Sequence, residues 1–100
     1  MIAVIFRAEL AQLDDEYYRV ARQLRLLAKS KYGCTSFISV CEDDTELTIS
    51  YWDNLEQVER WKRDPEHVRA QAKGSGCWYR SYQVDVTEVL RRSASNDNSG

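Results

Sequence analysis

Residues 34–52, CTSFISVCEDDTELTISYW, decide the fold, because they predict two strands joined by a tight polar turn. Cys34–Glu42 alternates weakly between apolar and polar residues. Glu46–Trp52 is rich in the β-branched and aromatic residues that favour strands. The acidic residues between these two segments form the polar connection of a hairpin. The segments on either side of this hairpin then determine the architecture.

A strand and an amphipathic helix are predicted before the hairpin. Ile2–Glu9 predicts the strand, and the alternation of a strand gives it largely apolar side chains on both faces. From about residue 12 to residue 31, apolar residues recur at steps of three and four, which is typical of an amphipathic helix. Gly33 closes this helix, because glycine takes the left-handed cap without steric cost.

A broken helix and a long strand are predicted after the hairpin. Asn54 followed by Gln57 resembles a capping box and predicts a helix start. Asp64 and Pro65 interrupt this helix, and a second piece is expected over Pro65–Lys73, ended by a Gly-Ser-Gly step. The last strand is expected over Cys77–Leu90.

The resulting order of strand, helix, strand, strand, helix, strand predicts an α+β ferredoxin-like domain with an antiparallel sheet. Two helices cover one face of such a sheet, whereas the first and last strands carry apolar side chains on both faces. Because monomers rarely tolerate a large apolar patch, we expect a second copy to stack on the bare face. This homodimer is expected to enclose a pocket. The alternative is a half-polar face exposed to water.

The domain is expected over residues 1–91, followed by a disordered polar tail over residues 92–100.

The composition argues against several classes of binding partner and site. The net charge is −2, and no basic stripe suited to nucleic acid occurs, so the basic cluster Arg19–Lys31 is interpreted as a solvated helix face. Three dispersed cysteines and one histidine predict neither a disulfide framework nor a metal site. The free thiols fit a reducing cytosol, so we expect a cytoplasmic protein, and no apolar run reaches the length of a membrane span, so we expect no membrane partner.

Several stretches carry a family resemblance. They are the first strand Ile2–Phe6, then Ile49–Asp53, Val58–Lys62, Pro65–Gln71 and finally Trp78–Tyr82. Together they resemble the antibiotic biosynthesis monooxygenase domain family, a set of dimeric α/β barrels, over roughly residues 1–91. That family includes cofactor-independent oxygenases that convert reduced polycyclic phenols into quinones. It also includes haem-degrading enzymes and many proteins with no assigned reaction.

The resemblance implies a small monooxygenase that acts on an aromatic, quinol-like or polyketide-type substrate with no metal or flavin cofactor. The quinone-forming enzymes place an amide side chain four residues before the second tryptophan, as Gln57 stands before Trp61. They place a polar aromatic residue six positions after it, where this chain has His67. Arg80 is the nearest match to their arginine on the last strand. His67, Trp61 and Arg80 are therefore the candidate catalytic residues.

The candidate substrate-binding residues are Gln57, Gln71, Trp52, Tyr51 and Tyr82. The tryptophans are expected either to wall a pocket for a flat ligand by stacking or to pack in the core. The glutamines either orient substrate oxygens or face solvent, and the tyrosines either line the barrel or pack. The candidate catalytic arginine either holds an anion or pairs with an acid on a neighbouring strand.

Two alternatives to an oxygenase follow from the same family. Haem degraders share two tryptophans nine residues apart, a spacing that Trp52 and Trp61 match. Their iron-ligating histidine lies ten residues after the second tryptophan, where this chain has Gln71, a poor haem ligand. Haem cleavage is therefore disfavoured, and a non-catalytic small-molecule-binding or accessory protein on the same barrel is the stronger alternative.

His67 is the only side chain in the chain whose unperturbed pKa lies near neutrality. As a base, it would take a proton from an activated phenol or carbon acid. The electron-rich anion that remains would pass an electron to oxygen without a metal. The alternative interpretation is a surface histidine near the start of a helix.

Overall fold

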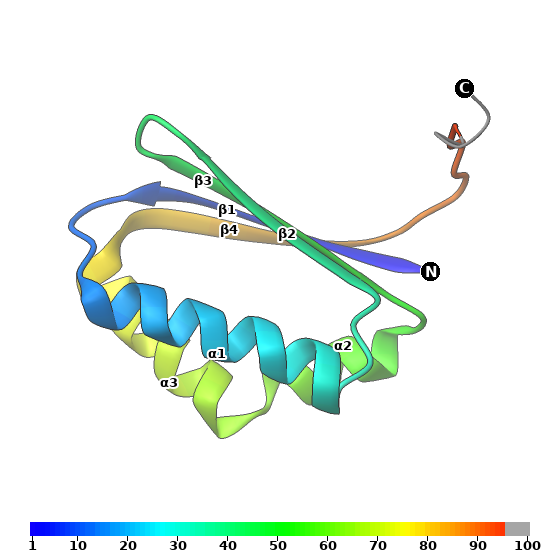
Figure 1. Cartoon of the computed structure of the whole chain (residues 1–100), viewed down its shortest axis with the longest axis horizontal. Helices are drawn as coiled ribbons and strands as arrows, with labels where there is room; N and C mark the ends of the chain where they lie inside the picture. The colour runs from blue at the N-terminus through cyan, green and yellow to red at the C-terminus, as the bar shows by residue number, and fades with distance from the viewer. Residues whose placement is uncertain (96–100) are drawn as a thin grey trace.

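The computed structural model describes residues 1–95 and has the predicted ferredoxin-like α+β architecture. Its elements are β1 (Ile2–Leu10), α1 (Asp15–Lys31), β2 (Ser36–Glu42), β3 (Thr45–Trp52), α2 (Leu55–Lys62), α3 (Pro65–Lys73), the π-helical turn η1 (Gly74–Trp78) and β4 (Tyr79–Glu88). The strands lie in the order β2-β3-β1-β4, and each pairs antiparallel with its neighbours. Helices α1, α2 and α3 all lie on one side of this sheet (Figure 1).

The central hairpin is confirmed in both its strands and its turn. Pairing runs from Ser36 opposite Tyr51 to Glu42 opposite Thr45. Asp43 has a φ of 53°, a left-handed conformation that aspartate tolerates better than most residues. The tight acidic turn therefore determines the register of the two strands.

Helix α1 begins later than the predicted position near residue 12, because Asp14 acts as its N-cap. Asp14 has extended backbone dihedrals, and its side chain accepts a hydrogen bond from the Tyr17 backbone N–H at 2.9 Å. The predicted glycine cap is confirmed at the other end, where Gly33 has a φ of 82°.

The predicted break between α2 and α3 is also confirmed. At the start of α2, the Gln57 backbone N–H donates to Asn54 Oδ1, and the Gln57 side chain accepts from the Asp53 backbone N–H, each at 3.0 Å. Asp64 caps α3 by accepting from the Glu66 backbone N–H at 2.8 Å, and Pro65 occupies the first turn.

The sequence predicts that the Gly-Ser-Gly step ends the helix, and this prediction is wrong. The chain continues through η1, and the last strand begins at Tyr79 instead of Cys77. The extra turn seats Trp78, which is 2% exposed and donates its indole N–H to Asp14 at 3.2 Å. Gly74 permits this turn, because a Cβ there would lie 2.7 Å from Cε2 of Tyr79. Residues 92–95 carry no helix or strand, and residues 96–100 of the predicted tail lie outside the described part.

The helix-facing side of the sheet holds a core concentrated at one end. The core comprises Val4, Ala28, Cys34, Trp52, Val58 and Trp61. Trp52 and Val58 are completely buried, and the Trp52 ring centroid lies 5.2 Å from that of Trp61. Helices α1 and α2 are therefore anchored to the sheet mainly through the end of β3.

The opposite side of the sheet, which we call the open face, is not covered by any helix of residues 1–95 (Figure 1). Its apolar members, from alternation and register, are Ala3, Ile5, Ile38, Val40, Leu47, Ile49 and Tyr51. Ile38 and Val40 are more than half exposed. The last strand differs from the prediction, because its open-face residues are Ser81, Gln83, Asp85 and Thr87, while Tyr82, Val84 and Val86 face the helices.

The described residues include no helix that is both long enough and apolar enough to cross a membrane.

Candidate functional site

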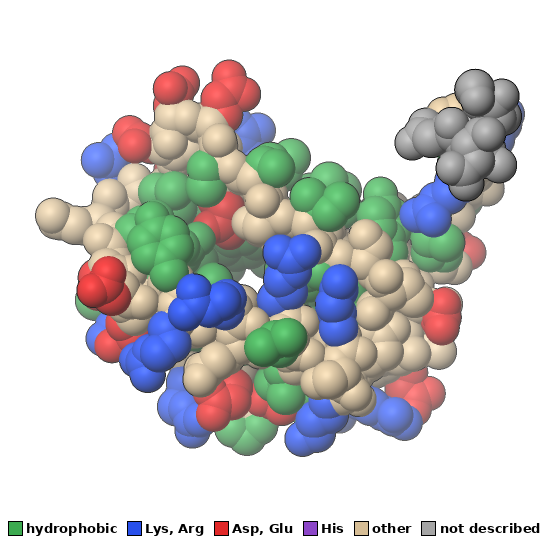
Figure 2. Space-filling model, in the orientation of Figure 1, with side chains coloured by type: hydrophobic (Ala, Val, Ile, Leu, Met, Phe, Trp, Pro, Cys, Tyr) green, Lys and Arg blue, Asp and Glu red, His purple; other side chains and the backbone are tan. Residues whose placement is uncertain are grey.

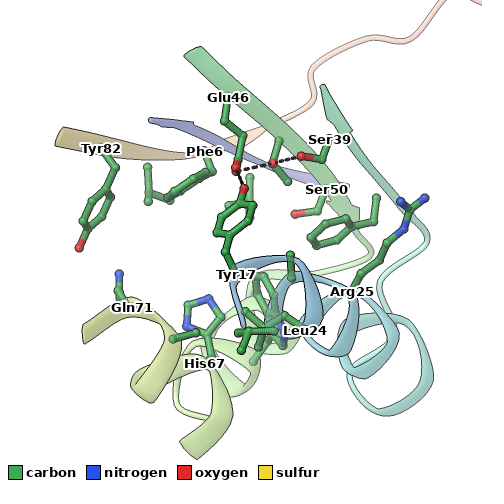
Figure 3. A pocket seen from close by; sticks show the side chains of 18 of the residues that line it. Phe6, Tyr17, Leu24, Arg25, Ser39, Glu46, Ser50, His67, Gln71 and Tyr82 are labelled. Carbon is green, nitrogen blue, oxygen red and sulfur yellow. Dashed lines mark hydrogen bonds between the residues drawn. The ribbon is translucent and has the colours of Figure 1, made fainter. Parts of the chain in front are cut away.

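A cavity of about 420 Å³ lies between the sheet and the helices (Figure 3). Its apolar walls include Val4 and Phe6 from β1, Val20 and Leu24 from α1, Phe37 from β2 and Trp61 from α2. The residues that line this cavity within one chain come from the sheet and from all three helices, and the predicted enclosure of a pocket by two copies stays a prediction. A volume of this size suits a small organic ligand.

The cavity exists because small polar side chains stand where a core would need large apolar ones. Thr48 and Ser50 on β3 and Ser39 on β2 form part of the lining. Opposite them, only Tyr17 and Ala28 of α1 are buried. The apolar residues that lie between these two on α1 therefore face an open space instead of packing on the sheet.

Glu46 places a carboxyl group in this cavity, and it is only 5% exposed. It accepts hydrogen bonds from the Tyr17 hydroxyl and, at 3.1 Å, from the Thr48 hydroxyl (Figure 3). Thr48 in turn shares a 2.8 Å hydrogen bond with Ser39. Burial raises the pKa of Glu46, although the Thr48 hydrogen bond opposes the rise. The carboxyl group is therefore biased towards its neutral form and linked through hydroxyl groups to exposed Ser39.

An aromatic cluster forms the wall beside Glu46. Phe6 stacks on Tyr82 with ring centroids 5.7 Å apart and meets Tyr79 edge-on at 5.4 Å. Burial, and then the neighbouring charge of Glu46, raises the pKa of Tyr79 far above its ordinary value. Tyr79 therefore remains a neutral hydroxyl donor at physiological pH.

His67 lies on α3 and faces the cavity from the helix side (Figure 3). Its ring centroid lies 4.3 Å from that of Trp61. Burial is the main cause that lowers the pKa of His67; the Lys62 charge adds to it, and the Asp64 charge opposes it. Neutral imidazole, the form able to accept a proton, is therefore favoured near neutral pH.

Two buried ring nitrogens at this wall have no hydrogen-bond partner within residues 1–95. They are Nδ1 of His67 and Nε1 of Trp61. Buried polar groups in folded proteins are nearly always paired, so each such exception needs an explanation. Both nitrogens belong to residues that line the cavity, so the incomplete pairing is located at its wall.

Four of the predicted site residues line the cavity together: Trp61, His67, Gln71 and Tyr82. They come from α2, α3 and β4, which are separated along the chain. Figure 3 shows His67 and Gln71 on α3 below the cavity and Tyr82 on the sheet across from them. The structure thus brings together the histidine, one tryptophan, one glutamine and one tyrosine.

The other four predicted site residues lie elsewhere. Trp52 is fully buried behind Trp61 and donates its indole N–H to Ser50. Gln57 caps the start of α2. Tyr51 lies on the open face, where the Arg92 guanidinium carbon is 4.8 Å from its ring centroid.

Arg80, the remaining one, is exposed and does not line the cavity. It coincides with an irregularity in the β1–β4 pairing, where Ser81 pairs with Glu9 but Tyr79 pairs with Leu10. Arg80 is therefore the extra residue of a β-bulge.

Sequence reasoning missed Tyr17 and Glu46. Tyr17 lies in the stretch of residues 12–31, whose periodicity predicts only an amphipathic helix, and Glu46 is only the first residue of a predicted strand. A signal was present, because Glu46, Thr48 and Ser50 alternate with apolar residues and therefore share one face of β3. A strand face with three polar residues under helices indicates a polar-lined cavity.

Comparison with known proteins then places the chain among relatives. No protein-family model matches it. Over 98 residues it is 35% identical to the uncharacterized protein YqjZ of Bacillus subtilis (strain 168), covering 97% of this chain and 86% of YqjZ. The chain belongs to the YqjZ family.

Several solved structures have the same fold as this member of the YqjZ family. SnoaB, a cofactor-independent oxygenase from Streptomyces nogalater, matches with a TM-score of 0.76 and 11% identity, over 91% of this chain and 94% of SnoaB. A putative antibiotic biosynthesis monooxygenase from Nitrosomonas europaea matches with a TM-score of 0.74 and 8% identity, over 91% of this chain and 100% of that protein. The fold implied by the antibiotic biosynthesis monooxygenase resemblance is therefore confirmed.

Proposed function

We propose that this protein is a cofactor-independent monooxygenase that oxidises a flat phenol or related carbon acid with O₂. The observation that carries the proposal is His67, whose imidazole has a lowered pKa and lines an aromatic-walled cavity. The fold shared with SnoaB, itself a cofactor-independent oxygenase, supports the general kind of chemistry.

The reaction begins with proton transfer from the substrate to His67. General-base catalysis of this kind contributes about 10²–10⁴-fold to the rate. The resulting anion gives one electron to O₂, and the substrate radical and superoxide then combine to form a carbon–oxygen bond. Protonation of the peroxide and loss of water leave a new carbonyl group. The substrate thus loses two hydrogen atoms and gains one oxygen atom, and the second oxygen atom leaves as water.

The other cavity residues orient the substrate. Trp61 and the Phe6–Tyr82 stack provide flat surfaces for an aromatic ring. Glu46, held by Tyr17, offers a hydrogen-bonding group on the sheet side, opposite His67 on the helix side. A substrate that carries oxygen atoms at two edges would therefore meet a polar partner at each edge.

The protein is further proposed to act as a homodimer through its open face. Apolar side chains of β1, β2 and β3 support this pairing, because no helix of the described residues covers them. Two such sheets stacked face to face would bury them, as in a sandwich. The cavity lies on the other side of the sheet, and none of its lining residues within residues 1–95 belongs to the open face.

Oxygen uptake with a panel of anthrones and polycyclic phenols tests the oxygenase activity, because each gains one oxygen atom when it becomes the quinone. The wild type should consume O₂ and form the quinone, and His67→Gln should lower the rate at least about 100-fold. Val68→Gln is the matched control, because Val68 is 52% exposed beside His67 on the same helix. Its rate should match the wild type.

The same panel separates the alternatives. Thermal stabilisation by these compounds without oxygen uptake would contradict the oxygenase and favour a non-catalytic binding protein. A Soret band on adding haem would favour haem binding despite Gln71. A His67→Gln variant that retains full turnover would remove this residue from the mechanism.

A further inference from the structure

Three basic side chains line the cavity at its solvent side. Arg22 and Arg25 come from α1, and Lys62 is the last residue of α2. All three are exposed, and none forms an ion pair within residues 1–95. In Figure 2, Lys and Arg side chains gather where α1 meets the sheet layer.

The structure divides the basic cluster Arg19–Lys31, which the sequence predicted to be a solvated helix face. Arg22 and Arg25 line the cavity, whereas Arg19 and Lys29 do not. Residues three apart on a helix lie on the same face, so the two cavity arginines project together. They and Lys62 form what we call the basic mouth.

Arg25 is held over an aromatic wall of the cavity. Its guanidinium carbon lies 5.9 Å from the ring centroid of Phe37 on β2, within the range of a cation–π contact. This contact keeps the planar guanidinium near the opening, where its donors can meet a carboxylate in pairs. Figure 3 shows Arg25 extending from α1 at the edge of the cavity.

The interior of the cavity has the opposite electrostatic character. Among residues 1–95, Glu46 is the only acidic side chain in its lining, and His67 is the only histidine. Neither offers a positive charge at neutral pH, and most of the surrounding lining is apolar or aromatic. An anionic group would be poorly stabilised deep inside but well stabilised at the basic mouth, since low-dielectric walls focus the field of charges at a cleft.

We propose that the ligand of this cavity is an aromatic anion, whose flat ring system fills the interior and whose carboxylate stays at the basic mouth. The inference deepens the proposed oxygenase by naming its substrate class. It also gives the ligand a direction, because the ring edge remote from the carboxylate points inward, towards His67 and Glu46. The basic mouth thus contributes to the affinity for the ligand and also determines its orientation.

A matched pair of ligands tests the proposal directly. Anthraquinone-2-carboxylate and its neutral amide have nearly the same size and ring system. We expect the carboxylate to bind the wild type about tenfold more tightly at low salt, as measured by quenching of tryptophan fluorescence. The preference should shrink as salt is added, because the basic mouth is exposed to solvent.

Two triple variants identify where the preference arises. Arg22→Gln/Arg25→Gln/Lys62→Gln should bind both ligands equally, with the affinity for the amide unchanged. Arg19→Gln/Lys29→Gln/Arg63→Gln removes the same charge from exposed positions outside the cavity lining, and it should keep the preference for the carboxylate. Equal binding of the two ligands by the wild type would overturn the proposal. Equal loss of the preference in both variants would also overturn it, because net charge would then be the cause.

This binding experiment is independent of turnover. A wild type that prefers the carboxylate but consumes no O₂ would retain the ligand class and reject the oxygenase. A wild type that oxidises neutral phenols but does not prefer the carboxylate would retain the oxygenase and reject the ligand class.

Discussion

The two faces of strand β3 carry opposite kinds of side chains. Polar residues lie on the face that the helices cover, and apolar residues lie on the face that no described helix covers. Glu46, Thr48 and Ser50 lie under the helices, whereas Leu47 and Ile49 lie on the open face. Antiparallel sheets with one covered face usually place apolar residues on that face. The polar residues of the covered face line the cavity, and the apolar residues of the open face are the ones that the proposed dimer would bury.

The two faces of the sheet should also contribute to stability in different ways. On the helix side, large core side chains gather around Trp52, at the far end of β3 from Glu46. On the open face, apolar side chains remain available for contacts that one chain cannot make. Substitutions on the two faces should therefore differ in kind as well as in size.

The largest effect is expected from a charge placed on the open face. Ile49→Lys would bury an unpaired ammonium group twice in a twofold interface, and an uncompensated buried charge costs about 3–5 kcal/mol. We expect the dimer dissociation constant to rise at least about 1,000-fold, measured by sedimentation velocity. Gln83→Lys, on the polar strand of the same face, is the control and should stay dimeric. A wild type that sediments as a single 11.7 kDa chain would refute the pairing.

The next effect compares neighbouring residues on opposite faces. Trp52→Ala should lower the free energy of unfolding by about 3–5 kcal/mol, because it leaves a large cavity in a completely buried site. Tyr51→Ala should act through the dimer, so its effect should depend on protein concentration. Chemical denaturation at two concentrations measures both variants. Equal, concentration-independent losses would contradict the assignment of the two faces.

A smaller effect is expected from the hydrogen bond inside the cavity. Tyr17→Phe removes the donor to the buried Glu46 carboxyl and should lower the free energy of unfolding by about 1–3 kcal/mol. Tyr18→Phe is the matched control, because Tyr18 is 56% exposed on the same turn and should lose almost nothing. Equal losses in the two variants would show that the Tyr17–Glu46 contact adds no stability.

The smallest effect concerns pH. Burial lowers the pKa of His67 in the folded state, so the unfolded chain binds a proton more readily as pH falls below about 6.5. The wild type should therefore lose stability relative to His67→Gln between pH 7 and pH 5. Glu46 acts with the opposite sign, because its raised pKa costs stability as pH rises above about 4.5.

Urea unfolding of the wild type, His67→Gln and Glu46→Gln at several pH values measures both slopes. A wild type that gains stability relative to His67→Gln on acidification would contradict the depressed pKa of the imidazole.

Much of the fold could be predicted, because short-range chemistry determines it. Asn54 with Gln57, Asp64 with Pro65, and Gly33 each act within a few residues of a helix end, and each behaves as its type predicts. The order of strands and helices along the chain is the one that predicts a ferredoxin-like domain. The π turn was missed because Trp78 is drawn inward by a partner 64 positions away in sequence.

The candidate site was predicted only in part, because alternation shows which residues share a face but not which face the helices cover. The sequence therefore does not show that Glu46 lies on the face of β3 that the helices cover. The family resemblance selected His67 and Trp61, which line the cavity. It also selected Gln57, whose side chain is used by a helix cap, and Arg80, which a bulge removes from the regular alternation.

Because the described lining of the cavity comes from one chain and from the helix side of its sheet, the two copies of a dimer should work independently. If a wild-type subunit is paired with a His67→Gln subunit, the mixed particle should retain half the turnover of the intact one, with no change in substrate concentration dependence. Saturation curves should accordingly be hyperbolic, since ligand uptake on one side of each sheet leaves the contact on the other side undisturbed.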